Sequence, residues 1–445
     1  MDPFASALEQ AAAVRRAEVA SRELVDLYLA RIERINPELN HYVLITPDLA
    51  HEMADAIAGE DRLAGAPCSI KDLISVAGYP TTLGSKAFEG LMLPFDGFAV
   101  SQLKRAGTPI LGKTNTSEFG TRPVVEHGLF PPARNPWNPE HTTGGSSGGA
   151  AGAVAAGLCA FAQGSDGGGS VRIPASCCGV VGFKPTRGAI SPGPMFGERW
   201  AGLSTDGAIA RSVDDAWAAV RAMIGHLPGD PFWSEPDPEA RQSPLRIGFD
   251  AAAGKLDPEV KAAVLDAGRE CERLGHHVEA AGPDTAPFRE PMLVVVAAGV
   301  TSLPIPDPDE LSDPLNRRTV TEGAALSAAD YLRAVDAIRI HSRQVVAFWG
   351  AHDVLLTPTL TKPAPRLNTL GVDLSVAHDE YLDWLTYTYP YNCTGQPAIS
   401  LPLATHSSGL PIGVQLVGPP RGERTLVELA RQLFAGKAAR PPGTD

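Results

Sequence analysis

Two serines stand in glycine-dense segments that suit nucleophilic chemistry. Ser146 lies in Gly144-Gly145-Ser146-Ser147-Gly148-Gly149, and Ser170 lies in the segment 164–174. A serine hydroxyl becomes a useful nucleophile when a base takes its proton. Glycines allow successive N–H groups to point at one place, as an oxyanion requires. A flexible Gly/Ser loop is the plain alternative for either segment alone. Two such segments, one on each side of the apolar stretch Ala150–Ala162, favour a catalytic site instead. The predicted donors to the oxyanion are the N–H groups of Gly167, Gly168, Gly169 and Ser170.

Lys71 is the candidate base. Leu63–Asp72 predicts a turn and then a buried strand that ends at this lysine. A lysine there could simply extend its amine from the strand end into water. The alternative is a desolvated amine, because burial disfavours the ammonium form and lowers the pKa until the side chain can act as a base.

Together, Lys71, Gly144–Gly149 and Asp166–Pro174 resemble the amidase signature family of serine hydrolases. The resemblance covers most of the chain, and the central glycine-serine block is its most specific part. The order and spacing of Lys71, Ser146 and Ser170 match the family pattern. Gly167 departs from it, because a larger residue is common at that position; we expect the backbone donors to be unaffected.

The resemblance implies a role for each of these residues. Ser170 would be the nucleophile, and Ser146, which follows a cis peptide bond in the family, would bridge Ser170 and Lys71. Lys71 would be neutral at rest and would be the final base. A hydroxyl both donates and accepts, so Ser146 could relay the proton. The implied activity is hydrolysis of amide C–N bonds through an acyl-enzyme, without metal or cofactor.

Contacts to the substrate are harder to predict than the catalytic residues. Phe196, Trp200 and the tyrosines of segment 376–391 suggest apolar or aromatic substrate groups. Anilides, carbamates and esters share the same tetrahedral chemistry. Arg172 could form a structural ion pair with Asp166 or contact a substrate carboxylate. The predicted substrate contacts are Gly144, Gly145, Arg172, Phe196, Trp200 and Tyr389.

The elements that must position these residues predict an α/β fold. Segments 245–250, 258–274 and 277–280 form a strand–helix–strand pattern, which indicates a parallel layer. Ala150–Ala162 predicts a buried helix of small residues. The family resemblance implies a mixed central β-sheet flanked by helices on both faces. We expect a single domain over residues 1–445, with a helical N-terminal segment 1–60 and a more variable, substrate-side region at about 220–345.

Composition restricts the partners and the compartment. The 445 residues carry 38 Lys plus Arg and 51 Asp plus Glu, a net charge of −13, which argues against nucleic-acid or anionic-membrane binding. The six cysteines show no zinc spacing and fit reduced thiols. No signal peptide is recognised at the start. We therefore expect a cytoplasmic enzyme acting on a small-molecule amide, with a homodimer left open.

Three alternatives remain at this point. One is the glutaminase component of a transfer-RNA-dependent amidotransferase, which the same resemblance allows. A catalytically dead scaffold is another. The third is nucleotide binding through Gly107–Thr114, which matches the phosphate-loop pattern G-x-x-x-x-G-K-[ST]. That pattern requires a loop between a strand and a helix, whereas here its middle positions are themselves an apolar strand.

Overall fold

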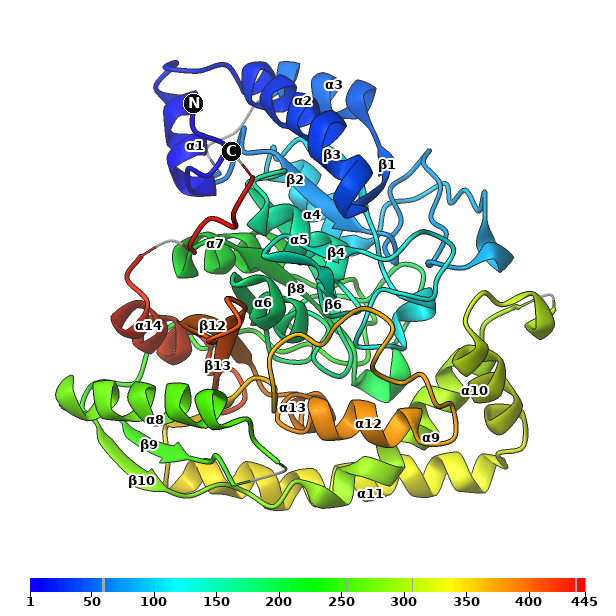
Figure 1. The fold of residues 1–445 in the computed structure, drawn as a ribbon, viewed down its shortest axis with the longest axis vertical. Coiled ribbons are helices and arrows are strands. Elements are labelled where there is room, and N and C mark those ends of the chain that lie inside the picture. Colours follow the sequence, from blue (N-terminus) through cyan, green and yellow to red (C-terminus); the bar gives the residue numbers. More distant parts are fainter. Residues whose placement is uncertain (58–60, 253–254, 306, 437, 445) are drawn as a thin grey trace.

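A mixed β-sheet runs through the molecule and carries the helices on its two faces (Figure 1). The computed structural model describes residues 1–57, 61–252, 255–305, 307–436 and 438–444. Within them, eleven strands form one sheet in the order β1-β3-β2-β6-β8-β7-β12-β13-β11-β9-β10. The strands are β1 (Tyr42–Ile45), β2 (Cys68–Lys71), β3 (Ile110–Thr114), β6 (Phe161–Asp166), β7 (Val181–Lys184), β8 (Thr205–Ala210), β9 (Arg246–Phe249), β10 (His277–Ala280), β11 (Val354–Pro358), β12 (Ala398–Thr405) and β13 (Pro411–Val417), while β4 (Arg134–Asn135) and β5 (Asn138–Thr142) pair separately.

Strand direction confirms the predicted mixed sheet. β2 pairs in parallel with both β3 and β6, and β9 pairs in parallel with β10 and β11. The pairs β6–β8, β8–β7, β7–β12 and β12–β13 are antiparallel. Because β2, β3 and β6 run the same way, the residues that follow them gather at one edge of the sheet, where α/β proteins commonly bind ligands.

Consecutive residues of β7 show that helices cover both faces. A Cβ at Gly182 would lie 2.6 Å from the Ala175 side chain, so this position faces a helix on one side. The next residue, Phe183, stacks on Trp217 on the other side, because strand side chains alternate between faces. The helices are α1 (Ala7–Arg15), α2 (Ser21–Leu39), α3 (Pro47–Asp55), α4 (Phe98–Arg105), α5 (Gly148–Ala155), α6 (Arg172–Cys178), α7 (Val213–Met223), α8 (Pro258–Arg273), α9 (Arg289–Thr301), α10 (Pro314–Ala324), α11 (Ala328–Ala347), α12 (Ala377–Trp384), α13 (Pro390–Cys393) and α14 (Glu423–Leu433).

The predicted helix Ala150–Ala162 is too long. Helix α5 ends at Ala155, and Gly157 then takes a left-handed conformation with φ of 66°, which closes the helix as glycine commonly does. Phe161 and Ala162 belong to β6, where they pair with β2 and β8. Composition alone does not separate a short buried helix from the buried strand that follows it.

The region predicted as variable supplies a group of helices beside the sheet. α9 packs against both α10 and α11 (Figure 1, lower right). Residues 253–254 and 306 of this region, and 58–60 of the predicted helical segment, lie outside the described residues. The single domain stays a prediction. No helix among the described residues has the length and apolar character needed to cross a membrane.

Candidate active site

Lys71 ends β2, the third strand in the order of the sheet, and its side chain is fully buried. Its Nζ donates to Ser146 Oγ at 2.7 Å and to Ser165 Oγ at 3.0 Å. The two serines come from different segments, one preceding α5 and one on β6 beside β2. The end of β2 therefore places the Lys71 amine where its hydrogen-bond partners are two serine hydroxyls.

Ser146 is held by a tight backbone turn. The peptide bond between Gly145 and Ser146 is cis, as the family resemblance implies. Gly145 has no room for a side chain, because a Cβ there would lie 2.7 Å from the Val124 backbone nitrogen. Glycine at this position therefore lets two backbone segments meet directly behind Ser146.

Burial lowers the pKa of Lys71 to about 7 because it disfavours the ammonium form. The negative charges of Asp166 and Asp206 oppose this effect, and the positive charge of Arg199 reinforces it. Lys113 provides a contrast within the same sheet: it is also buried, but its Nζ donates to Asp72 at 2.7 Å. Among the described residues, Lys71 forms no ion pair with a carboxylate.

Ser170 lies where the second glycine segment turns into α6. The Ser147 N–H donates to the Ser170 carbonyl oxygen at 3.2 Å, which ties the two glycine segments together. The Ser170 side chain is 8% exposed and lines two cavities. No hydrogen bond joins the Ser146 and Ser170 hydroxyls in the described chain, so only the lysine half of the predicted relay is formed here. Such contacts often tighten only when substrate binds.

The predicted oxyanion donors need one correction. The Gly169 N–H donates to Asp166 Oδ1 at 2.8 Å and is therefore already occupied. Across the described residues, the N–H groups of Gly167, Gly168 and Ser170 have no such partner, so these three remain the candidates. Gly169 itself has φ of 129°, a conformation that requires glycine.

Arg172 forms the ion pair with Asp166 that was one of the two alternatives predicted from the sequence, and it lines neither cavity beside Ser170. The guanidinium is fully buried and donates to both carboxylate oxygens of Asp166, at 2.9 and 3.0 Å. Its remaining bonds go to the Thr388 carbonyl, Gln415 Oε1 and Asn392 Oδ1. Arg172 holds the pKa of the Asp166 carboxyl far below its usual range. The pair anchors the turn that carries Ser170.

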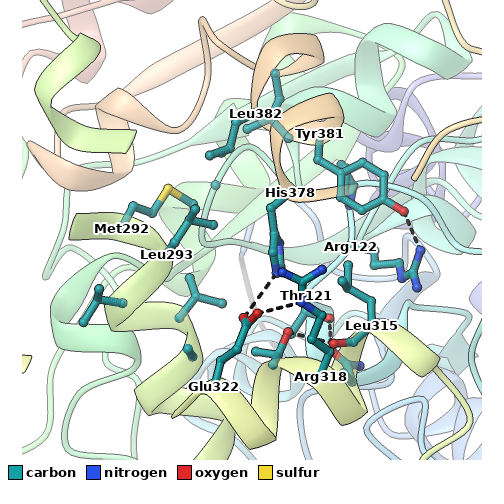
Figure 2. A pocket seen from close by; sticks show the side chains of 18 of the residues that line it. Thr121, Arg122, Met292, Leu293, Leu315, Arg318, Glu322, His378, Tyr381 and Leu382 are labelled. Carbon is teal, nitrogen blue, oxygen red and sulfur yellow. Dashed lines mark hydrogen bonds and ion pairs between the residues drawn. The ribbon is translucent and has the colours of Figure 1, made fainter. Parts of the chain in front are cut away.

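The larger cavity, of about 370 Å³, opens beside Ser170 and Gly168. In Figure 2, Met292, Leu293 and Leu382 give it an apolar wall, and Glu322 contacts Arg318 and His378 in a charged group apart from that wall. Arg318 Nε donates to Glu322 at 2.6 Å, and His378 Nε2 lies 3.9 Å from the same carboxylate. The cavity therefore combines an apolar wall with charged side chains, which also include Arg122, Glu290 and Asp379.

The smaller cavity, of about 130 Å³, lies on the side of Ser146. Ser146, Ser165 and Ser170 line it together with Phe196 and Trp200. Trp200 also lines the larger cavity, so its ring stands between the two.

Trp200 also explains the departure from the family pattern at Gly167. A Cβ on Gly167 would lie 2.7 Å from Trp200 Cζ3, and a Cβ on Gly299 would lie 2.9 Å from Trp200 Nε1. The indole therefore occupies the space that a larger residue at position 167 would need.

Three other residues that were predicted to contact substrate lie away from the lining of both cavities. Gly144, Gly145 and Tyr389 line neither cavity. Gly144 packs against Cys177 and Pro174, and Tyr389 is buried with 3% of its surface exposed. Their nearness in sequence to Ser146, or their aromatic character, suggested contacts that the packing does not allow. Phe196 and Trp200 do reach a cavity.

The phosphate-loop match at Gly107–Thr114 is not a loop. Residues 110–114 form β3, and Glu118–Gly120, a single 3₁₀ turn, follows in place of a helix. Lys113 is buried, and its Nζ donates to Asp72 and, at 3.0 Å, to Thr81 Oγ1. A phosphate would find neither the loop nor the free lysine that the pattern requires.

Ser165 was missed from the sequence. It contacts the Lys71 amine because β6 lies beside β2 in parallel register, with Ser69 opposite Ala162. That register is not visible in either segment alone. In the described part of the chain, no group of three or more His, Cys, Asp or Glu side chains is placed to hold a metal ion.

Comparison with known proteins points to one family. The family model described as Amidase matches residues 23–427. The 6-aminohexanoate-cyclic-dimer hydrolase of Pseudomonas sp. strain NK87 is 35% identical to this chain, and the alignment covers 97% of this chain and 95% of that enzyme. The enzyme of the same name from Paenarthrobacter ureafaciens is 36% identical, with the same coverage of both chains. A solved structure of 6-aminohexanoate cyclic dimer hydrolase complexed with substrate superposes with a TM-score of 0.94 at 32% identity and covers all of both chains.

Proposed function

The chain belongs to the amidase family and is a hydrolase of amide C–N bonds, and on this basis we propose that it cleaves small amides through an acyl-enzyme on Ser170. One observation carries the proposal: the buried Lys71 amine bonds to Ser146 and Ser165 and to no carboxylate in the described chain. An ammonium without a paired carboxylate is costly to bury, which lowers the pKa of Lys71 to about 7, so the neutral amine that can accept a proton predominates above that pH.

Acylation begins when Ser170 Oγ attacks the amide carbonyl carbon. The Ser170 proton passes to Ser146 Oγ while the Ser146 proton passes to Lys71 Nζ, so no charge builds up on the relaying hydroxyl. The carbonyl oxygen becomes an oxyanion, which the N–H groups of Gly167, Gly168 and Ser170 stabilise. Each such donor contributes about 10²–10³ in rate.

Collapse of the tetrahedral intermediate breaks the C–N bond. The leaving nitrogen takes a proton from Ser146 Oγ, which is reprotonated from Lys71. Water then attacks the acyl carbon and gives its proton to the same relay; when the C–O bond to Ser170 breaks, the relay returns that proton to Ser170 Oγ and the carboxylic acid leaves. Lys71 ends the cycle neutral.

The two cavities support a division of the substrate about the scissile bond. The leaving nitrogen must face Ser146, its proton donor, and Ser146 lines only the smaller cavity. The amine therefore occupies the smaller cavity and the acyl group the larger one. The substrate we propose has a long, mainly apolar acyl group and a compact amine.

Phe196 and Trp200 beside the smaller cavity extend the proposal to aryl amines. Anilides, carbamates and esters pass through the same tetrahedral intermediate and belong in a substrate panel. The relatives named for 6-aminohexanoate cyclic dimer make that compound a further probe.

Replacing the nucleophile tests the proposal most simply. Ser170→Ala is expected to lower kcat/KM for octanamide by roughly 10³-fold or more, because the covalent step is removed. Ser408→Ala, on an exposed loop, is the matched control and is expected to keep wild-type activity. Activity of Ser170→Ala within tenfold of wild type would contradict the role, and L-glutamine hydrolysed in preference to octanamide would favour the amidotransferase glutaminase.

The pH dependence follows from the Lys71 pKa of about 7. Below that pH the amine becomes an ammonium and cannot take the relayed proton, so activity must fall on the acid side. We expect kcat/KM for octanamide to decline about tenfold per pH unit on the acid limb, with a midpoint near that pKa. A profile that is flat from pH 5 to pH 8 would show that Lys71 is not the base.

Two isomeric amides test the assignment of the cavities. Octanamide places its chain on the acyl side and N-hexylacetamide on the amine side, and we expect octanamide to be preferred on the order of tenfold or more. Leu293→Trp, in the larger cavity, should lower kcat/KM for octanamide, and Leu303→Trp, in the smaller one, should act mainly on N-hexylacetamide. The reverse pattern would exchange the two assignments.

A further inference from the structure

A charged pair that the mechanism does not use lies close to the catalytic amine. Arg199 precedes a short turn at Trp200–Gly202, and Asp206 lies in β8. Arg199 Nη2 lies 3.0 Å from Asp206 Oδ2, and the two side chains are 12% and 3% exposed. An ion pair so deeply placed could stabilise the fold alone or act on its neighbours.

Asp206 connects to Lys71 through one fully buried side chain. Gln163 Nε2 donates to Asp206 Oδ1 at 3.1 Å, and Gln163 Oε1 accepts the Lys71 backbone N–H at 3.1 Å. Asp206 is also the cross-strand partner of Ser165, whose hydroxyl bonds to Lys71 Nζ. Asp206 is therefore connected to the Lys71 backbone through Gln163, and it lies opposite the serine that binds the Lys71 amine.

We propose that Arg199 and Asp206 are positioning residues for Lys71, acting on its backbone through Gln163 and on its amine through their opposite charges. The inference rests on the proposed function, in which Lys71 must be neutral to accept a proton.

Three charged side chains act on the proton affinity of the amine. Asp166 and Asp206 favour the ammonium form, and Arg199 disfavours it. Asp166 is matched by Arg172 in a bidentate pair. The net effect of the remaining charges on the Lys71 amine therefore depends on Arg199 and Asp206. In a buried site, a unit charge within several ångströms changes proton affinity strongly.

Arg199 is bound less completely than a purely structural arginine. Its Nε has no hydrogen-bond partner among the described residues, and Nη2 meets Asp206 without the alignment of a hydrogen bond. Arg172, by contrast, uses Nε, Nη1 and Nη2. Arg199 also lines the smaller cavity, as Ser146 and Ser170 do.

The test removes each charge separately and follows the reactivity of Ser170 without a substrate. Wild type, Arg199→Met, Asp206→Asn, the double variant and Arg199→Lys are labelled with phenylmethylsulfonyl fluoride from pH 5 to pH 9. The rate of labelling is followed by intact mass, and the modified residue is identified by peptide mapping. The acid limb of this rate reports protonation of the base.

The two single variants are expected to move the acid limb in opposite directions. Arg199→Met removes a positive charge and shifts the limb to higher pH by on the order of one unit, and Asp206→Asn shifts it to lower pH. The double variant returns toward wild type, and Arg199→Lys, which keeps the charge, stays closer to it than Arg199→Met. Should Asp206→Asn fail to fold, the contrast between the two Arg199 variants decides the matter.

A merely structural ion pair gives a different result. Both single variants would then lower the melting temperature while the acid limb stayed in place or moved the same way, which would overturn the inference. The proposed function would survive that outcome, provided that wild type is labelled at Ser170. Labelling elsewhere, together with full amide hydrolysis by Ser170→Ala, would instead overturn the proposed function itself.

Discussion

The amine of Lys71 lies in the interior between two serine hydroxyls, without a carboxylate beside it in the described chain. Burial of an ammonium in such a place is unfavourable, so the pKa of Lys71 falls to about 7 and the proposed base is available in its neutral form. The neighbouring elements hold the Lys71 amine in this environment. β2 carries the lysine inward, the turn at Gly145 brings Ser146 to it, and β6 places Ser165 on the remaining side. Lys113, one strand away, has Asp72 as its partner and keeps a structural role.

A second buried interaction fixes Ser170, the proposed nucleophile, relative to Lys71. Asp166 accepts from the Gly169 and Val171 N–H groups and from Arg172, so one carboxylate shapes the turn and joins it to α6. The cost of burying the Asp166 and Arg172 charges is offset because both make several hydrogen bonds. The same arrangement removes Gly169 from the oxyanion donors and leaves Gly167, Gly168 and Ser170 facing the cavities. Catalytic geometry and local stability thus depend on the same few atoms.

Glycine-rich turns and a lysine at a strand end carry strong local constraints, and the structure brings Lys71 and Ser146, which the sequence singles out, into direct contact. The sequence predicts the mixed sheet and the strand–helix–strand unit of β9, α8 and β10 for similar reasons. It fails where the answer depends on long-range register or packing. Ser165 reaches Lys71 only because β6 lies beside β2, and Tyr389 is buried beside the site and lines neither cavity. Trp200 fits beside Gly167 because the loop that carries it returns to the second glycine segment, a contact that no local pattern indicates.

The neutral state of Lys71 can be measured directly by nuclear magnetic resonance of protein labelled with ¹³C at lysine Cε, because the chain has only nine lysines. The Lys71 signal is assigned as the one that disappears in Lys71→Arg, which separates it from Lys184, whose pKa burial also lowers to about 7. The account predicts that the Lys71 signal titrates with a midpoint of about 7 and is that of a neutral amine above it. A Lys71 signal that remains that of an ammonium up to pH 9 would contradict the central claim.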